Sequence, residues 1–285
     1  MDYEPPPPGL PDSLHHKYGF SMYSARYGNI YTVRQLLQLV QEVAGNWKPV
    51  DYVWEKDGKF YDALRPSVEA YGFNLKREVI EQREHHISNV NKLFKELDVL
   101  IFTLGLTEMW VHKESGTVYP TAPGTIVGKY DSKHYEFKNA EYDEILSDFY
   151  NFVEILGKIR NNRSFKIILT VSPVPLTATA SGNHVLVSST YSKSVLRAVA
   201  GELSLNHEDI DYFPSYELVT NPRLHSSAFE GNLRSVRNEI VEIVMKHFFI
   251  EHPSISNKNK NENLILDKDN SSVACDDILL EDFIK

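Results

Sequence analysis

Two short apolar runs constrain the fold of this chain more than any other feature of its sequence. They are residues 99–102 (Val-Leu-Ile-Phe) and residues 165–171 (Phe-Lys-Ile-Ile-Leu-Thr-Val). A run that is apolar at successive positions is typical of a strand buried on both faces, and each run follows a segment with helical spacing. Helices that alternate with such strands predict an α/β fold with a mostly parallel sheet, covered by helices on both faces.

The spacing of apolar residues predicts the remaining elements. We expect helices at about 33–44, 74–97, 142–160, 191–203 and 235–249, with Thr32 and Asn74 as candidate N-caps. A third, short strand is expected at 210–213, and turn signals between 111 and 140 predict a small hairpin insertion. Doubly wound sheets ordinarily start with a strand, and none precedes the first helix. One interpretation is therefore that the chain lacks its first strand.

The chain is expected to divide into three parts. Residues 1–19 form a proline-rich lead-in, which Pro5–Pro8 should keep extended. Residues 20–250 form the α/β domain. Residues 251–285 read as a disordered polar tail, in which apolar residues return as a short terminal helix near 278–284.

Composition and charge exclude several classes of function. A net charge of −9 argues against a nucleic-acid partner, and no apolar run approaches the roughly 20 residues of a membrane span. The single cysteine, Cys275, excludes a disulfide framework and a cysteine-based zinc site. No metal-binding histidine spacing, Walker loop or Gly-x-Gly-x-x-Gly motif occurs, so no cofactor is expected. A cytoplasmic protein follows as the default.

In a parallel sheet, functional side chains collect where the strands end. Gly105 and Glu108 follow the first apolar run. Gly105 permits a tight turn or a close approach to a ligand. Glu108 would orient a histidine or bind a substrate hydroxyl, and the alternative is that it caps a helix N-terminus.

Ser172 follows the second apolar run and His184 ends the polar loop after it. Ser172 is a candidate nucleophile, although it is not within a Gly-x-Ser-x-Gly motif, and its alternative role is to satisfy local backbone groups. His184 is the best-placed candidate general base, with an ordinary surface histidine as the alternative. A Ser172–His184 dyad is a weaker hypothesis.

Gly28 and Asn29 lie just before the first predicted helix. Their polar groups could be presented to a developing oxyanion beside the helix N-terminus. The alternative is an ordinary turn that leads into the helix.

Taken together, five segments resemble the GSCFA family, which is similar to the SGNH hydrolases. The matching stretches are residues 24–32, 103–108, 171–176, 191–197 and 211–217. The resemblance implies a three-layer α/β/α sandwich. It also implies ester hydrolysis or acyl transfer on a small-molecule or glycan substrate.

The resemblance also marks site positions and departures. By this resemblance, Gly28 and Asn29 lie where an SGNH-like enzyme has its oxyanion-hole glycine. Gly105 lies at the glycine of the Gly-x-Asn motif, whose asparagine is replaced in this chain. The name-giving Gly-Ser-Cys-Phe-Ala segment, with its expected nucleophile, does not occur, which agrees with a missing first strand. In place of an Asp-x-x-His motif stands Gly-Asn-Leu-Arg, so that Arg234 replaces the histidine and becomes a candidate substrate-binding residue.

Two functions remain open at this stage. One is a weakly active or inactive member of an esterase or acyltransferase family. The other is a non-catalytic module that binds a glycan or a partner on the same scaffold. The sequence predicts neither the acyl group nor the oligomeric state.

Overall fold

A computed structural model describes residues 2–223 and 225–253 of the chain. Its central sheet has three parallel strands in the order β3-β7-β8, which span Val99–Leu104, Lys166–Val171 and Ile210–Tyr212. These are the three strands that the sequence predicts, each within two residues of its expected ends. The tail predicted at 251–285 lies outside the described residues from position 254 onward.

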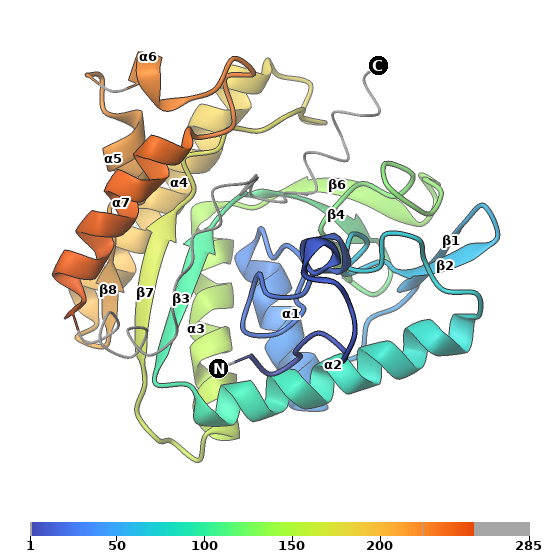
Figure 1. The fold of residues 1–285 in the computed structure, drawn as a ribbon. Helices are drawn as coiled ribbons and strands as arrows, with labels where there is room; N and C mark the ends of the chain where they lie inside the picture. The colour runs from blue at the N-terminus through green and yellow to red at the C-terminus, as the bar shows by residue number, and fades with distance from the viewer. Residues whose placement is uncertain (1, 224, 254–285) are drawn as a thin grey trace.

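Helices lie on both faces of this sheet, as the sequence predicts (Figure 1). On one face lie α3 (Tyr142–Ile159) and α4 (Val185–Asn206), with α1 (Val33–Val43) packed beside α3. On the other face lie α5 (Ser215–Thr220) and α7 (Asn238–Glu251). The expected α/β fold, with a parallel sheet between helical layers, is confirmed.

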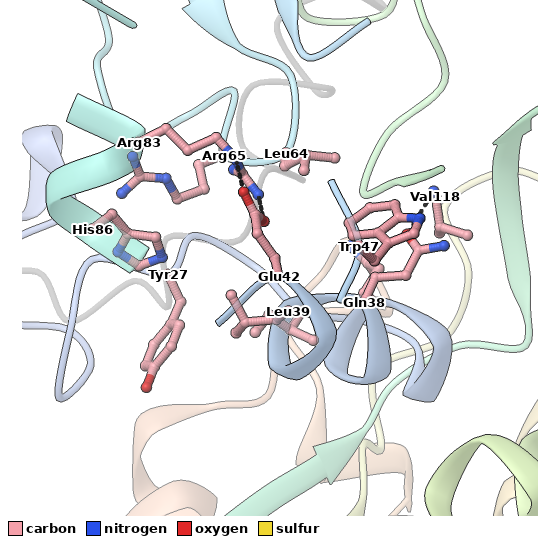
Figure 2. Close-up of a pocket in the computed structure, with 12 residues that line it drawn as sticks. Tyr27, Gln38, Leu39, Glu42, Trp47, Leu64, Arg65, Arg83, His86 and Val118 are labelled. Atoms are coloured by element: carbon pink, nitrogen blue, oxygen red, sulfur yellow. Dashed lines mark hydrogen bonds and ion pairs between the residues drawn. The ribbon is translucent and has the colours of Figure 1, made fainter. Parts of the chain in front are cut away.

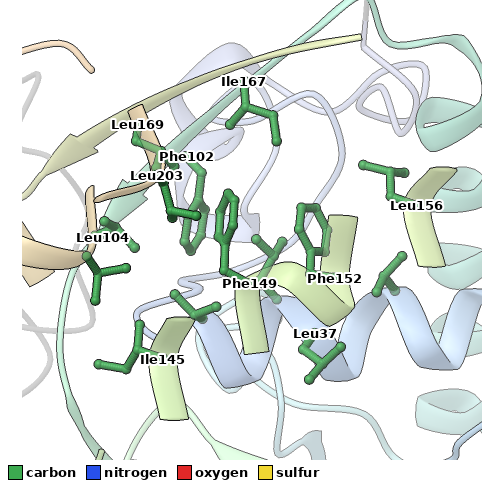
Figure 3. Packing of buried hydrophobic residues seen from close by; sticks show 14 of the residues in the cluster. Leu37, Phe102, Leu104, Ile145, Phe149, Phe152, Leu156, Ile167, Leu169 and Leu203 are labelled. Atoms are coloured by element: carbon green, nitrogen blue, oxygen red, sulfur yellow. The ribbon is translucent and has the colours of Figure 1, made fainter. Parts of the chain in front are cut away.

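The main core lies between the sheet and the layer of α1, α3 and α4. Phe149 and Phe152 of α3 are fully buried and extend toward the sheet, where Phe149 lies beside Phe102 of β3 (Figure 3). Leu37 of α1 packs from the far side of α3. Burying such large apolar side chains supplies the main stabilisation of the domain.

A second sheet replaces the simple hairpin that the sequence predicts between 111 and 140. Its strands are antiparallel in the order β5-β4-β6, and they span Val118–Tyr119, Glu108–His112 and Tyr135–Asn139. The central strand therefore begins at Glu108, only four residues after the parallel strand β3 ends. The chain passes from one sheet directly into the other.

The hairpin of β1 (Val53–Lys56) and β2 (Lys59–Asp62) was not predicted, because this stretch reads as a loop-rich segment. Its turn residues Asp57 and Gly58 both have positive φ angles, of 52° and 73°. An Asp-Gly turn of this kind matches the right-handed twist of two antiparallel strands. The dipeptide was the available signal for the hairpin. The hairpin packs against α2 (Lys76–Glu96).

Two helix starts differ from the expectation. Thr32 caps α1 with a reciprocal contact to Gln35, as predicted. Asn74, in contrast, does not cap α2; the N-cap position is Leu75, whose N–H donates to Glu78 Oε2 at 2.9 Å. α4 begins at Val185 rather than near residue 191, since its first turn is polar or exposed and has no clear apolar period.

The prediction that residues 99–102 are buried on both faces was wrong. Val99 is 37% exposed and Ile101 is 49% exposed, whereas Phe102 and Leu104 are buried in the main core. β3 is the edge of the three-stranded sheet within the described residues, and only one of its faces is covered.

The proline-rich lead-in lies against the domain. Glu4 is only 4% exposed, and its carboxylate meets Nδ1 of His86 at 3.1 Å and the guanidinium of Arg26 at 3.5 Å. Short 3₁₀ turns follow at Asp12–Leu14 and His16–Tyr18. The lead-in is therefore attached through a buried carboxylate, and Tyr3 packs against the main core beside it.

Truncation of Phe149 should test how much the main core stabilises the domain. We expect Phe149→Ala to lower the free energy of unfolding by about 3–5 kcal/mol, because it leaves a cavity among fully buried side chains. The control is Asn151→Ala, at an exposed position of the same helix. Urea unfolding measures both, and equal midpoints for the two variants would contradict the assignment.

Candidate functional site

The segment 105–107, which joins β3 to β4, is held by the loop that precedes α1. The carbonyl oxygen of Tyr31 accepts hydrogen bonds from the N–H groups of Gly105 at 3.1 Å and Leu106 at 2.9 Å. A Cβ atom at position 105 would lie 2.9 Å from this oxygen, closer than side chains tolerate. Glycine is therefore required for this close approach. Both N–H groups have an acceptor, so neither points free toward an oxyanion.

α4 holds the same segment from the other side. Ser192 Oγ accepts a hydrogen bond from the N–H of Thr107 at 3.1 Å, and Lys193 Nζ donates to the carbonyl oxygen of Gly105 at 2.8 Å. Both side chains are buried. Sequence reasoning about the site missed this pair, although both residues lie within the stretch 191–197 that carries the family resemblance. The sequence shows a lysine at position 193 but not that it is buried. Its burial beside the end of β3 is visible only in the three-dimensional structure.

Glu108 directly follows this segment. It is the first residue of β4, so it does not cap a helix. Its side chain is buried, and burial raises the pKa of its carboxyl above the ordinary value, partly offset by a hydrogen bond from Thr179. Thr179 Oγ1 donates to Glu108 Oε1 at 2.7 Å. A carboxyl in this setting can exchange a proton or accept a hydrogen bond from a ligand hydroxyl.

A chain of hydroxyl groups continues from Glu108. Thr179 Oγ1 lies 2.8 Å from Ser181 Oγ, which lies 2.9 Å from Ser188 Oγ of α4. Each hydroxyl carries one proton, so the contacts can form a directed chain that ends on the carboxylate. These hydrogen-bonded hydroxyl groups hold the loop after β7 against both β4 and α4.

The structure does not join Ser172 to His184. Ser172 Oγ accepts a hydrogen bond from the N–H of Val174 at 3.2 Å. This is the alternative role predicted for Ser172, in which its hydroxyl satisfies a local backbone group. His184 is the N-cap of α4, and its Nδ1 accepts from the N–H of Leu186 at 3.2 Å. In a neutral ring this leaves the proton on Nε2, which then donates rather than accepts. No hydrogen bond links the two side chains in the described part of the chain.

Arg234 is brought to the same loop. Its Nε and Nη2 atoms donate to the carbonyl oxygen of Pro175 at 3.4 and 3.3 Å. The next residue of the loop, Leu176, donates its N–H to Ser189 Oγ of α4 at 3.0 Å. The loop after β7 thus connects Glu108, through Thr179, with Arg234.

Gly28 and Asn29 lie in the loop that supplies Tyr31. Gly28 has a φ of +68°, and a Cβ there would lie 3.4 Å from Arg65, so it serves a tight turn. Asn29 Oδ1 accepts a hydrogen bond from the hydroxyl of Tyr23 at 3.1 Å. Of this loop, it is the carbonyl of Tyr31 that contacts the end of β3.

A separate cavity of about 40 Å³ lies between α1 and α2 (Figure 2). The charged side chains of Glu42, Arg65 and Arg83 line it. Arg83 pairs with Glu42, and both Arg83 and Arg65 pair with the buried Asp62, Arg65 at 2.9 Å. Burial alone would raise the pKa of Asp62, yet the two guanidinium groups hold it below its ordinary value.

His86 also lines this cavity. Burial, together with the neighbouring guanidinium groups, lowers the pKa of His86 well below its ordinary value, so the ring is neutral and donates from Nδ1 to Glu4. The polar groups are thus paired with one another, and the cluster fastens the lead-in, the hairpin and α2 together. Sequence reasoning did not identify it, because its members are far apart in the chain.

The described residues contain neither a candidate metal site nor a membrane-spanning helix. No group of three or more histidine, cysteine, aspartate or glutamate side chains is arranged to hold a metal ion there. No helix within 2–223 and 225–253 combines the length and apolar character needed to cross a bilayer.

Comparison with known proteins yields one match. The model of the GSCFA family matches residues 12–248, which include all the residues of the sheet edge described above. No curated protein and no solved structure matches the chain.

Substitution of Gly105 should test the contact with Tyr31. We expect Gly105→Ala to lower the free energy of unfolding by about 1–3 kcal/mol, because the new methyl group meets a backbone oxygen that cannot move freely. The control is Gly231→Ala, where a Cβ meets no atom within 4 Å. If both variants unfold at the same urea concentration, the contact does not constrain the site.

The raised pKa of Glu108 predicts a pH-dependent stability difference. The folded carboxyl holds its proton more tightly than the unfolded one, so wild type loses stability relative to Glu108→Gln as the pH rises from below 4.5 to neutral. Urea unfolding of both proteins across this range measures the difference. A pH-independent difference would show that the carboxyl is not perturbed.

Proposed function

Because the chain belongs to the GSCFA family, we propose that it binds acyl esters as a member of an esterase or O-acyltransferase group, with carbohydrate esters as substrates. The observation that carries this proposal is the buried carboxyl of Glu108, set at the carboxyl edge of the sheet and hydrogen-bonded to Thr179. Ligands of parallel α/β sheets bind at this edge. A cytoplasmic setting belongs to the same proposal, since the chain has a single cysteine.

Glu108 is suited to a hydroxyl-rich substrate. One carboxylate oxygen is engaged by Thr179, and the carboxyl has a raised pKa. In this proposal, Glu108 binds a hydroxyl group of the substrate. Arg234, which donates to the carbonyl oxygen of Pro175, contacts the substrate near that loop. Ser172 directly follows β7 and lies three residues before Pro175.

Catalytic turnover by these residues should be weak. Ester cleavage needs a nucleophile, a base in contact with it and free oxyanion donors. Ser172 Oγ contacts the N–H of Val174, and His184 Nδ1 contacts the N–H of Leu186. The N–H of Gly105 is engaged by Tyr31.

These same contacts favour a second candidate function. In it the chain binds a glycan or a partner at the sheet edge without cleaving an ester. The two functions share the role of Glu108 and differ in turnover, so one set of proteins distinguishes them.

The test combines binding and turnover. We expect an O-acetylated oligosaccharide to bind the chain saturably in calorimetric titration, and Glu108→Gln to weaken binding about tenfold through loss of a charge-assisted hydrogen bond. Glu136→Gln, on the exposed side of β6, is the control and should bind as wild type does. Turnover of p-nitrophenyl acetate should stay near the background rate.

Each outcome has a distinct meaning. Binding with no cleavage of any acetyl ester would select the non-catalytic function. Robust turnover that Ser172→Ala abolishes would overturn the expectation of weak activity. Absence of binding, or equal binding by both variants, would overturn the role of Glu108.

A further inference from the structure

One face of β3 has no covering layer in the described residues. Val99 and Ile101 point to this face and are 37% and 49% exposed. No described helix lies in front of β3 in Figure 1, whereas α7 lies over the β8 side of the same face. Parallel sheets are ordinarily buried on both faces, so apolar residues here indicate that something covers them.

The neighbouring position on the same face is covered. Ile101 is the register partner of Ile168 in β7, and Ile168 is 5% exposed. Phe213 and Phe248 pack on Ile168, and Phe248 belongs to the last turn of α7. The apolar layer thus stops between two adjacent strands, about 5 Å apart.

The chain leaves α7 beside this boundary. α7 ends at Glu251, three residues after Phe248, and residues 254–285 follow the described part. Residues 254–277 alone could extend many times the distance between neighbouring strands. They carry no long apolar run, so they suit a connection.

The segment 278–284 has the composition to fill the gap. Acidic residues precede it, which favours the start of a helix, and acidic residues interrupt its apolar positions. At helical spacing its apolar residues gather on one side. They are Leu279, Leu280, Phe283 and Ile284.

We propose that residues 278–284 dock as a short amphipathic helix on the exposed face of β3, over Val99 and Ile101. The docked helix continues the layer that α7 begins and makes β3 a strand covered on both faces. The sheet then has the apolar burial that the sequence of β3 indicates.

The first test removes the apolar face of the segment in the full chain. Leu280→Asp combined with Phe283→Asp should increase the fluorescence of added ANS several-fold and speed hydrogen exchange in the amides of residues 99–104. Asp282→Asn, in the same segment, is the control and should leave both signals unchanged. Unchanged signals in the double variant would overturn the proposal.

The second test uses Cys275, which lies three residues before Ile278 and is the single cysteine of the chain. Ile101→Cys should give an intramolecular cross-link with a short bis-maleimide at least about tenfold faster than Leu205→Cys, because docking raises the local thiol concentration. Leu205 is 86% exposed at the far end of α4.

The other outcomes identify other occupants. A cross-link between chains, with a concentration-dependent dimer in gel filtration, would show that a second copy covers β3 and would overturn the proposal. Equal rates for the two cysteine variants would do the same. Protection of 99–104 that survives the double aspartate variant would indicate a strand paired with the edge of β3 and would also overturn the proposal.

Discussion

The carbonyl oxygen of Tyr31 determines how the chain leaves the central sheet. It accepts hydrogen bonds from the N–H groups of Gly105 and Leu106. The chain therefore does not enter a helix after β3, as it usually does after a parallel strand. Only glycine fits at position 105, since a Cβ would lie 2.9 Å from this oxygen. The chain then enters β4 at Glu108, so the parallel sheet and the β5-β4-β6 sheet share one junction.

α4 completes this junction with two buried polar residues. Ser192 and Lys193 each bind a backbone atom of the segment 105–107. Their contacts leave Glu108 at the rim, where the loop after β7 reaches it through Thr179. The location of a carboxyl at this edge therefore follows from backbone hydrogen bonds as much as from its own chemistry.

Helices and strands with a clear periodicity of apolar residues were predictable from the sequence. Elements whose position depends on contacts with other segments were not. Helix α3 and the strand β7 were located within one residue or so, because their apolar spacing reports directly on one buried face. The start of α4 was placed six residues late, since its first turns are held by polar contacts such as Ser188 with Ser181. The hairpin β1–β2 had only an Asp-Gly turn to mark it.

The sequence by itself determined the α/β class, the three parallel strands and the family, because these depend on local periodicity and on motifs along the chain. It also identified Glu108 as a residue at a strand end. Only the tertiary structure decided what that residue touches and that Ser172 and His184 bind separate backbone N–H groups. It alone also showed that one face of β3 is exposed within the described residues. The reason is physical: burial and hydrogen-bond partners are properties of pairs of segments, and a single segment does not contain them.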